Sequence, residues 1–423
     1  MDAPINAKQL LNNLLQKHYT EARAAKEQGQ LVAWSASVAP QEFCETMGIQ
    51  VVYPENHAAA IGARGGALDL LAVAEGNGYA LDLCSYARVN LGYMEVQDCI
   101  TENIPLPDLV ISCNNICNTM HKWYENLACQ LKVPLIMIDL PYNHSYAVEQ
   151  QRVDYIKDQF IEAIRQLEII CGRPFDYARF QEVMQISVES ARWWKYVTDL
   201  AQAVPSPLNG FEIFNYMALI VCMRGKPECA QAFQLMAREL EDKIALGESA
   251  FAEGEKYRVI WEGIACWPYL SHNFKALKSR GINMVCSTYP GIWSLLYEAN
   301  DLDAMARAYS GVTNNCSLDK QVDLRTGLIR NFSCDGAIYH VNRSCKVMDF
   351  MQYEMARRIS AETGIPGVEF DGDQTDPRNF STAQFETRIE TLVEMMAAKK
   401  DVQGWTNVGV PWMASSDQEV QND

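Results

Sequence analysis

Cysteines at the ends of apolar segments are the residues of this 423-residue chain best suited to chemistry. Cys84 ends the segment YALDLC, and Cys113 and Cys117 bracket the turn after LVIS. Cys345 lies shortly after His340 in YHVNRSCK. A thiolate at a helix N-terminus is stabilised, so its pKa falls and it becomes a ready ligand. These positions indicate a dispersed three-thiolate site for a soft metal or a cluster, with one position open to substrate.

Two common cysteine motifs are absent from the sequence, and the competing interpretation is that most of the thiols are buried apolar side chains. Zinc sites usually contain paired C-x-x-C motifs and ferredoxin clusters a C-x-x-C-x-x-C run, and the sequence has neither. The fourteen cysteines are scattered without a compact disulfide framework. In a reducing compartment, most of them are expected to be small buried apolar side chains.

The elements that must position these residues alternate between strands and helices. Helical periodicity at 67–76 separates two of the apolar runs, and such alternation predicts a parallel sheet covered on both faces. The strands expected in the N-terminal third are 31–36, 51–55, 79–84, 109–113 and 134–141. A second alternating region has strand candidates at 257–263, 282–289, 335–340 and 367–373. A last helix is expected over 382–397, where Ser381 and Gln384 have capping-box spacing.

The predicted fold is α/β, with two parallel-sheet domains of the flavodoxin or Rossmann type joined by a helical segment. The boundaries expected are 1–145 for the first domain, 146–256 for the helical segment and 257–423 for the second domain. Ligands of such sheets sit outside the carboxyl ends of the strands. Ser37 follows one expected strand and Glu55 ends another, so they are candidates for the same site as the thiols.

Composition excludes several classes of partner. A formal net charge of −17 argues against broad binding to nucleic acid or to an anionic membrane. The longest apolar stretches, such as 216–223, fall well short of the ~20 residues that cross a bilayer. The N-terminus has neither a signal-peptide core nor the acid-poor composition of a transit peptide. A cytoplasmic location is expected.

Seven stretches of the sequence resemble one known family nearly from end to end, that of the 2-hydroxyacyl-CoA dehydratases, and its alpha subunit in particular. They are 34–49, 51–59, 81–90, 112–128, 209–221, 339–346 and 370–381. The resemblance implies a [4Fe–4S] cluster held by Cys84, Cys117 and Cys345, with its fourth iron open to water or substrate. Cys113 is the rival for the middle ligand.

The resemblance also implies an activity and roles for two further residues. Ser37 and Glu55 would be catalytic groups beside the substrate. An electron delivered to the thioester carbonyl would give a ketyl radical anion that expels the 2-hydroxyl group, after which a base removes the β proton and the electron returns. The expected substrate is (R)-lactoyl-CoA, and the products are acryloyl-CoA and water. A homologous beta subunit with its own cluster and an ATP-dependent iron–sulfur activator are the implied partners.

Four alternatives stay open at this stage. The chain could act on a longer or aromatic 2-hydroxyacyl-CoA, or it could be a subunit of the benzoyl-CoA reductase type. It could instead be a non-catalytic relay subunit, whose cluster would be closed by four protein ligands, or a structural zinc protein. Asn114 and Asn115 could donate hydrogen bonds to a cluster or simply form a turn.

Overall fold

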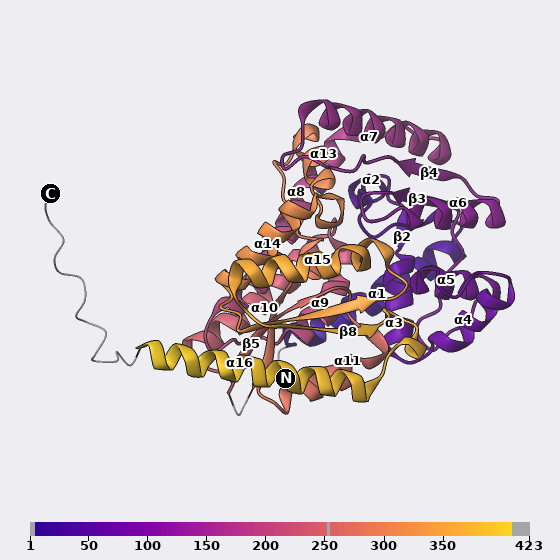
Figure 1. The fold of residues 1–423 in the computed structure, drawn as a ribbon. Coiled ribbons are helices and arrows are strands. Elements are labelled where there is room, and N and C mark those ends of the chain that lie inside the picture. The colour runs from indigo at the N-terminus through magenta and orange to yellow at the C-terminus, as the bar shows by residue number, and fades with distance from the viewer. Residues whose placement is uncertain (1–4, 252–253, 408–423) are drawn as a thin grey trace, which may run out of the picture.

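Two four-stranded parallel sheets form the framework of the computed structural model, which describes residues 5–251 and 254–407 (Figure 1). The first sheet has the order β2-β1-β3-β4 and the second β6-β5-β7-β8. The strands of the first sheet are β1 (Val32–Ser35), β2 (Gln50–Val52), β3 (Leu109–Cys113) and β4 (Leu135–Ile138). Those of the second are β5 (Tyr257–Glu262), β6 (Ile282–Ser287), β7 (Gly336–Asn342) and β8 (Gly367–Gly372). The predicted α/β class with two parallel sheets is confirmed.

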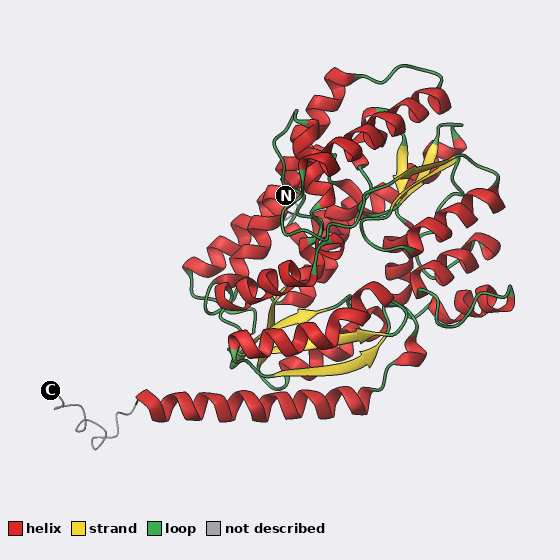
Figure 2. Cartoon of the chain, turned by 45° about the horizontal axis from the view of Figure 1, so that its top comes forward, coloured by secondary structure: helices red, strands yellow, loops and turns green. Residues whose placement is uncertain are grey.

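Burial explains why these segments become strands. Every residue of β1 and β3 is buried, as expected for central strands that are covered on both faces. Figure 2 shows helices on both faces of the second sheet, and the last helix runs along one of these faces. In the contacts, α15 (Lys346–Thr363) packs against β7, and α16 (Thr382–Asn407) packs against β8.

Helices of the N-terminal region connect and cover the first sheet. They are α1 (Ala7–Glu27), α2 (Gln41–Thr46), α3 (Pro54–Ala63), α4 (Ala67–Gly76), α5 (Ser85–Val96) and α6 (Thr119–Leu131). The helices of the second region before α15 are α11 (Leu270–Lys278), α12 (Thr288–Gly291), α13 (Leu302–Ser310) and α14 (Leu318–Asn331).

Four long helices occupy the expected helical segment: α7 (Gln150–Cys171), α8 (Tyr177–Asp199), α9 (Gly210–Met223) and α10 (Pro227–Ala245). They contact both sheets, because α7 packs against β4 while α9 packs against β6. The N-terminal helix α1 lies on α9 and α10. After β6 of the second sheet, the chain returns to the helical segment, where α13 packs against α7. The helices therefore fix the position of one sheet relative to the other.

The structure corrects two local predictions. Residues 79–84 form no strand; they are a turn between α4 and α5, with Leu81 63% and Leu83 43% exposed. Their alternating apolar pattern imitates a strand, but no neighbouring strand pairs with them. Glu55 is not at a strand end either, because β2 ends at Val52 and Glu55 lies in the first turn of α3.

No helix within the described part of the chain is both long enough and apolar enough to cross a membrane. The expected last helix is confirmed and runs further than predicted, to Asn407. Its first turn begins as the spacing suggested, because the Gln384 N–H donates to Ser381 Oγ at 3.4 Å.

Candidate active site

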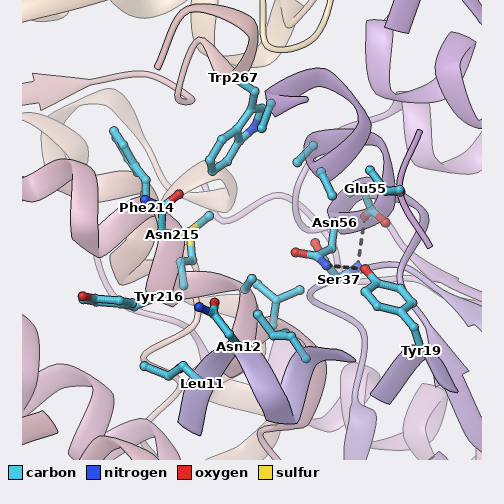
Figure 3. Close-up of a pocket in the computed structure, with 18 of the residues that line it drawn as sticks. Leu11, Asn12, Tyr19, Ser37, Glu55, Asn56, Phe214, Asn215, Tyr216 and Trp267 are labelled. Atoms are coloured by element: carbon cyan, nitrogen blue, oxygen red, sulfur yellow. Dashed lines mark hydrogen bonds between the residues drawn. The ribbon is translucent and has the colours of Figure 1, made fainter. Parts of the chain in front are cut away.

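A cavity of about 810 Å³ lies between the two halves of the molecule, a size typical of ligand pockets. Its wall is built by α1, α3, α9 and the segment around α12 (Figure 3). One side is aromatic, with Phe214, Trp267, Tyr289 and Trp293. Ser37 and Glu55 also line this cavity, so the structure brings together the two catalytic candidates named from the sequence.

Glu55 is held in place by hydrogen bonds to both carboxylate oxygens. The backbone N–H of Ser37 donates to Oε1 at 3.0 Å, and the Tyr124 hydroxyl donates to Oε2 at 3.2 Å. Burial raises the pKa of the Glu55 carboxyl, and the hydrogen bonds from Ser37 and Tyr124 counteract part of that rise. A carboxyl group with a raised pKa beside a cavity is suited to accept and return a proton.

Ser37 occupies the turn after β1 and is only 4% exposed. The Trp293 indole N–H donates to the Ser37 carbonyl oxygen at 3.0 Å, which fixes the backbone of this turn. Because the turn follows the carboxyl end of a central strand, it presents Ser37 at the edge where ligands of parallel sheets bind. The arrangement is rigid and ties Ser37 directly to the carboxylate of Glu55.

Three half-buried thiols stand at or just before the first residue of three helices. Cys84 precedes α5, Cys117 lies two residues before α6, and Cys345 precedes α15. Backbone N–H groups of each helix start, including those of Ala87 and Met348, act to lower the pKa of the neighbouring thiol. Helix N-termini favour negative charge, but burial outweighs this effect and raises the pKa of all three thiols, contrary to the fall expected from the sequence. The thiolate forms would therefore arise when a metal replaces the protons.

The same three thiols lie within electrostatic reach of one another. Burial raises the pKa of Cys345, and charge on Cys84 and Cys117 raises it further. Burial likewise raises the pKa of Cys84 to about 12, with a contribution from charge on Cys117. Among the described residues, no three His, Cys, Asp or Glu side chains surround a position for a single metal ion. The segments of Cys84 and Cys345 are in direct contact, because the Ser85 N–H donates to Ser344 Oγ at 3.1 Å, and the described residues form no compact mononuclear site.

The three thiols interact electrostatically with groups of the cavity that contains Glu55. Burial raises the pKa of Cys117, and charge on Glu55 raises it as well. Tyr289, which lines the cavity, has a pKa raised by burial and by charge on Cys345, Glu55 and Cys84.

None of the three thiols is among the residues that line the cavity, but Tyr86, two residues after Cys84, contacts two that are. The Trp267 indole N–H donates to the Tyr86 hydroxyl at 2.5 Å, and the Tyr289 hydroxyl lies 3.5 Å away from it. The thiols therefore lie near the cavity that contains the acid–base candidate Glu55.

Cys113, the rival of Cys117, has a different environment. It is fully buried at the end of β3, and its thiol donates to Asn115 Oδ1 at 2.9 Å. The Asn115 amide donates to the Tyr309 carbonyl oxygen at 3.0 Å, and the Asn114 amide donates to Asp139. Both asparagines thus use their amide donors to hold the turn, and neither donates to a thiol.

His340, five residues before Cys345 in the sequence, is a core residue. It is 1% exposed, its ring stacks on Phe370 at 4.9 Å, and its Nδ1 lies 2.6 Å from the Ile264 carbonyl oxygen. Burial lowers the pKa of this imidazole to about 4. It is therefore neutral near pH 7 and contacts the sheet rather than the thiols.

The loop after β8 contributes residues that the sequence did not identify. Asp373, Gln374, Thr375 and Asp376 are all nearly inaccessible to solvent, although three carry strongly polar groups. Gly62 of α3 permits their approach, since a Cβ atom there would lie 2.8 Å from the Thr375 methyl carbon. The stretch 370–381 was part of the family resemblance, and its run of polar residues directly after a strand was the available signal.

A buried ion-pair network joins this loop to the turn before Cys84. Arg88 is 0% exposed; its guanidinium contacts Glu75 at 2.6 Å and Asp376 at 3.2 Å. Its Nε also donates to the Leu83 carbonyl oxygen at 3.0 Å, one residue before the thiol. Arg378, which is largely accessible, adds ion pairs to the same two carboxylates.

Replacing Arg88 by methionine is expected to lower the free energy of unfolding by about 3 kcal/mol, because Asp376 would lose a buried partner. The matched change Arg378→Met removes the exposed partner and is expected to cost less than about 1 kcal/mol. Urea unfolding of both variants, followed by fluorescence, measures the difference. Equal destabilisation by the two changes would contradict the importance of the buried pair.

Comparison with known proteins gives a consistent result. A family model described as "2-hydroxyglutaryl-CoA dehydratase, D-component" matches residues 36–396. The (R)-2-hydroxyisocaproyl-CoA dehydratase alpha subunit of Clostridioides difficile is 52% identical, over 93% of this chain and 97% of that protein. The lactoyl-CoA dehydratase subunit alpha of Anaerotignum propionicum is 49% identical, over 93% of this chain and 97% of that protein. The (R)-phenyllactyl-CoA dehydratase alpha subunit of Clostridium sporogenes is 47% identical, over 94% of this chain and 97% of that protein.

The fold and site define an α/β enzyme subunit with a thiol-lined centre next to a ligand pocket. The chain belongs to the alpha-subunit family of the 2-hydroxyacyl-CoA dehydratases, which are hydro-lyases. The resemblance stated from the sequence is thereby confirmed.

Proposed function

We propose that this chain is the catalytic subunit of a 2-hydroxyacyl-CoA dehydratase and that Cys84, Cys117 and Cys345 hold a [4Fe–4S] cluster. The observation that supports the proposal is that three thiols at helix starts lie near the cavity of Glu55 and Ser37, with Tyr86 of the Cys84 segment against the lining residues Trp267 and Tyr289. A cluster used only to relay electrons has no need of an adjoining cavity of about 810 Å³.

The donor set fits this cofactor. Thiolates are the usual ligands of [4Fe–4S] clusters, and the three thiols surround no single-ion position among the described residues. Three protein ligands would leave one iron open. When bound, the cluster would supply one-electron chemistry and a Lewis-acidic iron for the thioester carbonyl.

The chain's own residues would bind the thioester and move the protons. Glu55, oriented at both oxygens by Ser37 and Tyr124, would take the β proton at its carboxylate and pass it on to the expelled hydroxide, which gives the product water. The Ser37 hydroxyl would donate a hydrogen bond to the thioester. The aromatic wall of the cavity would exclude water from the reacting carbons.

The cavity also supports a substrate class. Its aromatic side, with Phe214, Tyr289 and Trp293, would accept an apolar acyl chain. Lys8 and Arg64 also line the cavity and are exposed, so their charges would face the CoA phosphates. (R)-lactoyl-CoA, expected from the sequence, is the smallest such substrate. The aromatic wall favours bulkier apolar chains as a second candidate, in keeping with the named substrates of two relatives.

Two protein partners follow from the proposal. The relatives are named as alpha subunits, which supports a beta subunit for this chain. The electron would come from an ATP-dependent iron–sulfur activator. Both partners would need to be present in a complete assay.

Activity with a panel of thioesters tests the proposed function. We expect anaerobic, activator-dependent dehydration of (R)-lactoyl-CoA, (R)-2-hydroxyisocaproyl-CoA or (R)-phenyllactyl-CoA, with higher kcat/KM for the two bulkier chains. A preference of about tenfold would correspond to one or two additional buried methylene groups. Turnover of benzoyl-CoA with no 2-hydroxyacyl thioester accepted would overturn the proposal in favour of the reductase alternative.

A further inference from the structure

A buried glutamine lies against one of the three thiols and has no part in the mechanism above. Gln374, in the loop after β8, is 0% exposed, and its Nε2 donates to Cys84 Sγ at 3.3 Å. The two residues are 290 positions apart in the sequence. Burying a primary amide is unfavourable unless its polar atoms are paired, so this contact needs a reason.

The orientation of the Gln374 amide is determined by its neighbours. The Ser344 hydroxyl donates to Gln374 Oε1 at 3.2 Å. Ser344 Oγ itself accepts the backbone N–H of Ser85 at 3.1 Å, which leaves its own proton for Gln374. With the amide oxygen held in this way, the NH₂ group must face the sulfur. Ser344 and Ser85 are the immediate neighbours of the two thiols Cys345 and Cys84.

The backbone around Gln374 is also fixed. Asp373 Oδ1 accepts the backbone N–H groups of Thr375 and Asp376 at 3.1 and 3.2 Å and the Ser85 hydroxyl at 2.5 Å. The backbone N–H of Trp267 donates to the backbone carbonyl oxygen of Gln374 at 3.2 Å. The amide is therefore presented to Cys84 by a rigid loop rather than by a mobile side chain.

We propose that Gln374 is a positioning residue that donates a hydrogen bond to the Cys84 thiolate and thereby raises the reduction potential of the cluster. The inference rests on the proposed function. Adding one electron increases the negative charge on the cluster and its sulfur ligands, so an N–H donor stabilises the reduced form more than the oxidised form. Groups that hydrogen-bond to metal ligands commonly tune a centre in this way.

Anaerobic redox titration of the full chain, produced with its beta subunit, tests the inference. The signal of this chain's cluster is identified as the component missing from a Cys345→Ser preparation. At the potential where half of the wild-type cluster is reduced, we expect Gln374→Leu to lower the ratio of reduced to oxidised cluster about fivefold. Ser344→Ala, which releases the amide, is expected to move the ratio in the same direction by less.

Thr375→Val is the matched control, because it alters a buried residue of the same loop. The Thr375 hydroxyl has no hydrogen-bond partner, and valine retains the methyl group that contacts Gly62. We expect its potential to equal that of the wild type. If Gln374→Leu fails to fold, Gln374→Met keeps the side-chain length, removes the donor and is expected to lower the potential by a similar amount.

The possible results separate this inference from the proposed function. If both Gln374 variants contain a cluster with the same reduction potential as the wild type, the role of Gln374 is overturned and the proposed function is left intact. Equal shifts in Gln374→Leu and Thr375→Val would also overturn it, since they would reflect disturbance of the loop. A wild-type chain without iron and acid-labile sulfide would overturn both.

Discussion

Replacing Cys117 by serine is expected to remove the cluster from this chain. Iron and acid-labile sulfide should fall from about four of each per chain to less than about one, because a hydroxyl is a poor ligand for a [4Fe–4S] centre. Dehydration should fall below detection. Chemical analysis of anaerobically purified protein, together with its visible absorption spectrum, measures the loss.

Cys113→Ser is the matched control for that experiment. Cys113 is fully buried and donates to Asn115, a hydrogen bond that a serine hydroxyl can replace. Cys117 resembles the other two thiols in place, because all three are half-buried at helix starts, whereas Cys113 is buried within β3. We therefore expect the Cys113 variant to keep its iron. Loss of iron from this variant with retention in the Cys117 variant would reverse the assignment.

The change Glu55→Gln is expected to reduce kcat by roughly 10²–10⁴-fold, the usual contribution of a general base. The glutamine oxygen can still accept the Ser37 N–H, so the turn after β1 and the thiol site should remain intact. Iron content is the control for that integrity. Wild-type kcat in a variant with full iron content would contradict the role of Glu55.

The pH profile provides a second test of Glu55. Burial raises its pKa, so the basic form required for proton removal is lost at a higher pH than for an ordinary glutamate. The acidic limb of kcat should accordingly lie above about pH 4.3. Tyr124→Phe removes a hydrogen bond that stabilises the carboxylate and should move this limb to still higher pH. A limb unmoved in that variant would assign the titration to another group.

Much of the fold could be predicted from local patterns. The run at 109–113 is almost entirely apolar and that at 257–263 is rich in aromatic and β-branched residues, and both are buried central strands of parallel sheets. The run at 79–84 has comparable residues but no partner strand, so it stayed a turn. Pairing is a property of the assembled sheet, which explains why the pattern alone could not separate these cases.

The candidate site could be predicted in part, where its residues lie at or near the ends of predicted strands. Ser37 follows a strand, and the resemblance supplied Glu55, so their shared position could be anticipated. Gln374 could not be, because its contact with Cys84 depends on how the loop after β8 meets the start of α5. Local sequence carries no information on such a contact between distant segments. The buried partners Arg88 and Asp376 escaped notice for the same reason.

The most direct test of the account is the visible spectrum of the anaerobic protein before and after addition of a 2-hydroxyacyl-CoA. Iron and sulfide should be present in equal amounts, and the spectrum should shift on addition of (R)-2-hydroxyisocaproyl-CoA or (R)-lactoyl-CoA, because the thiols lie near the cavity. The shift should be absent from Cys117→Ser protein. A wild-type cluster that responds to no acyl-CoA would contradict the account and leave this chain an electron-relay subunit.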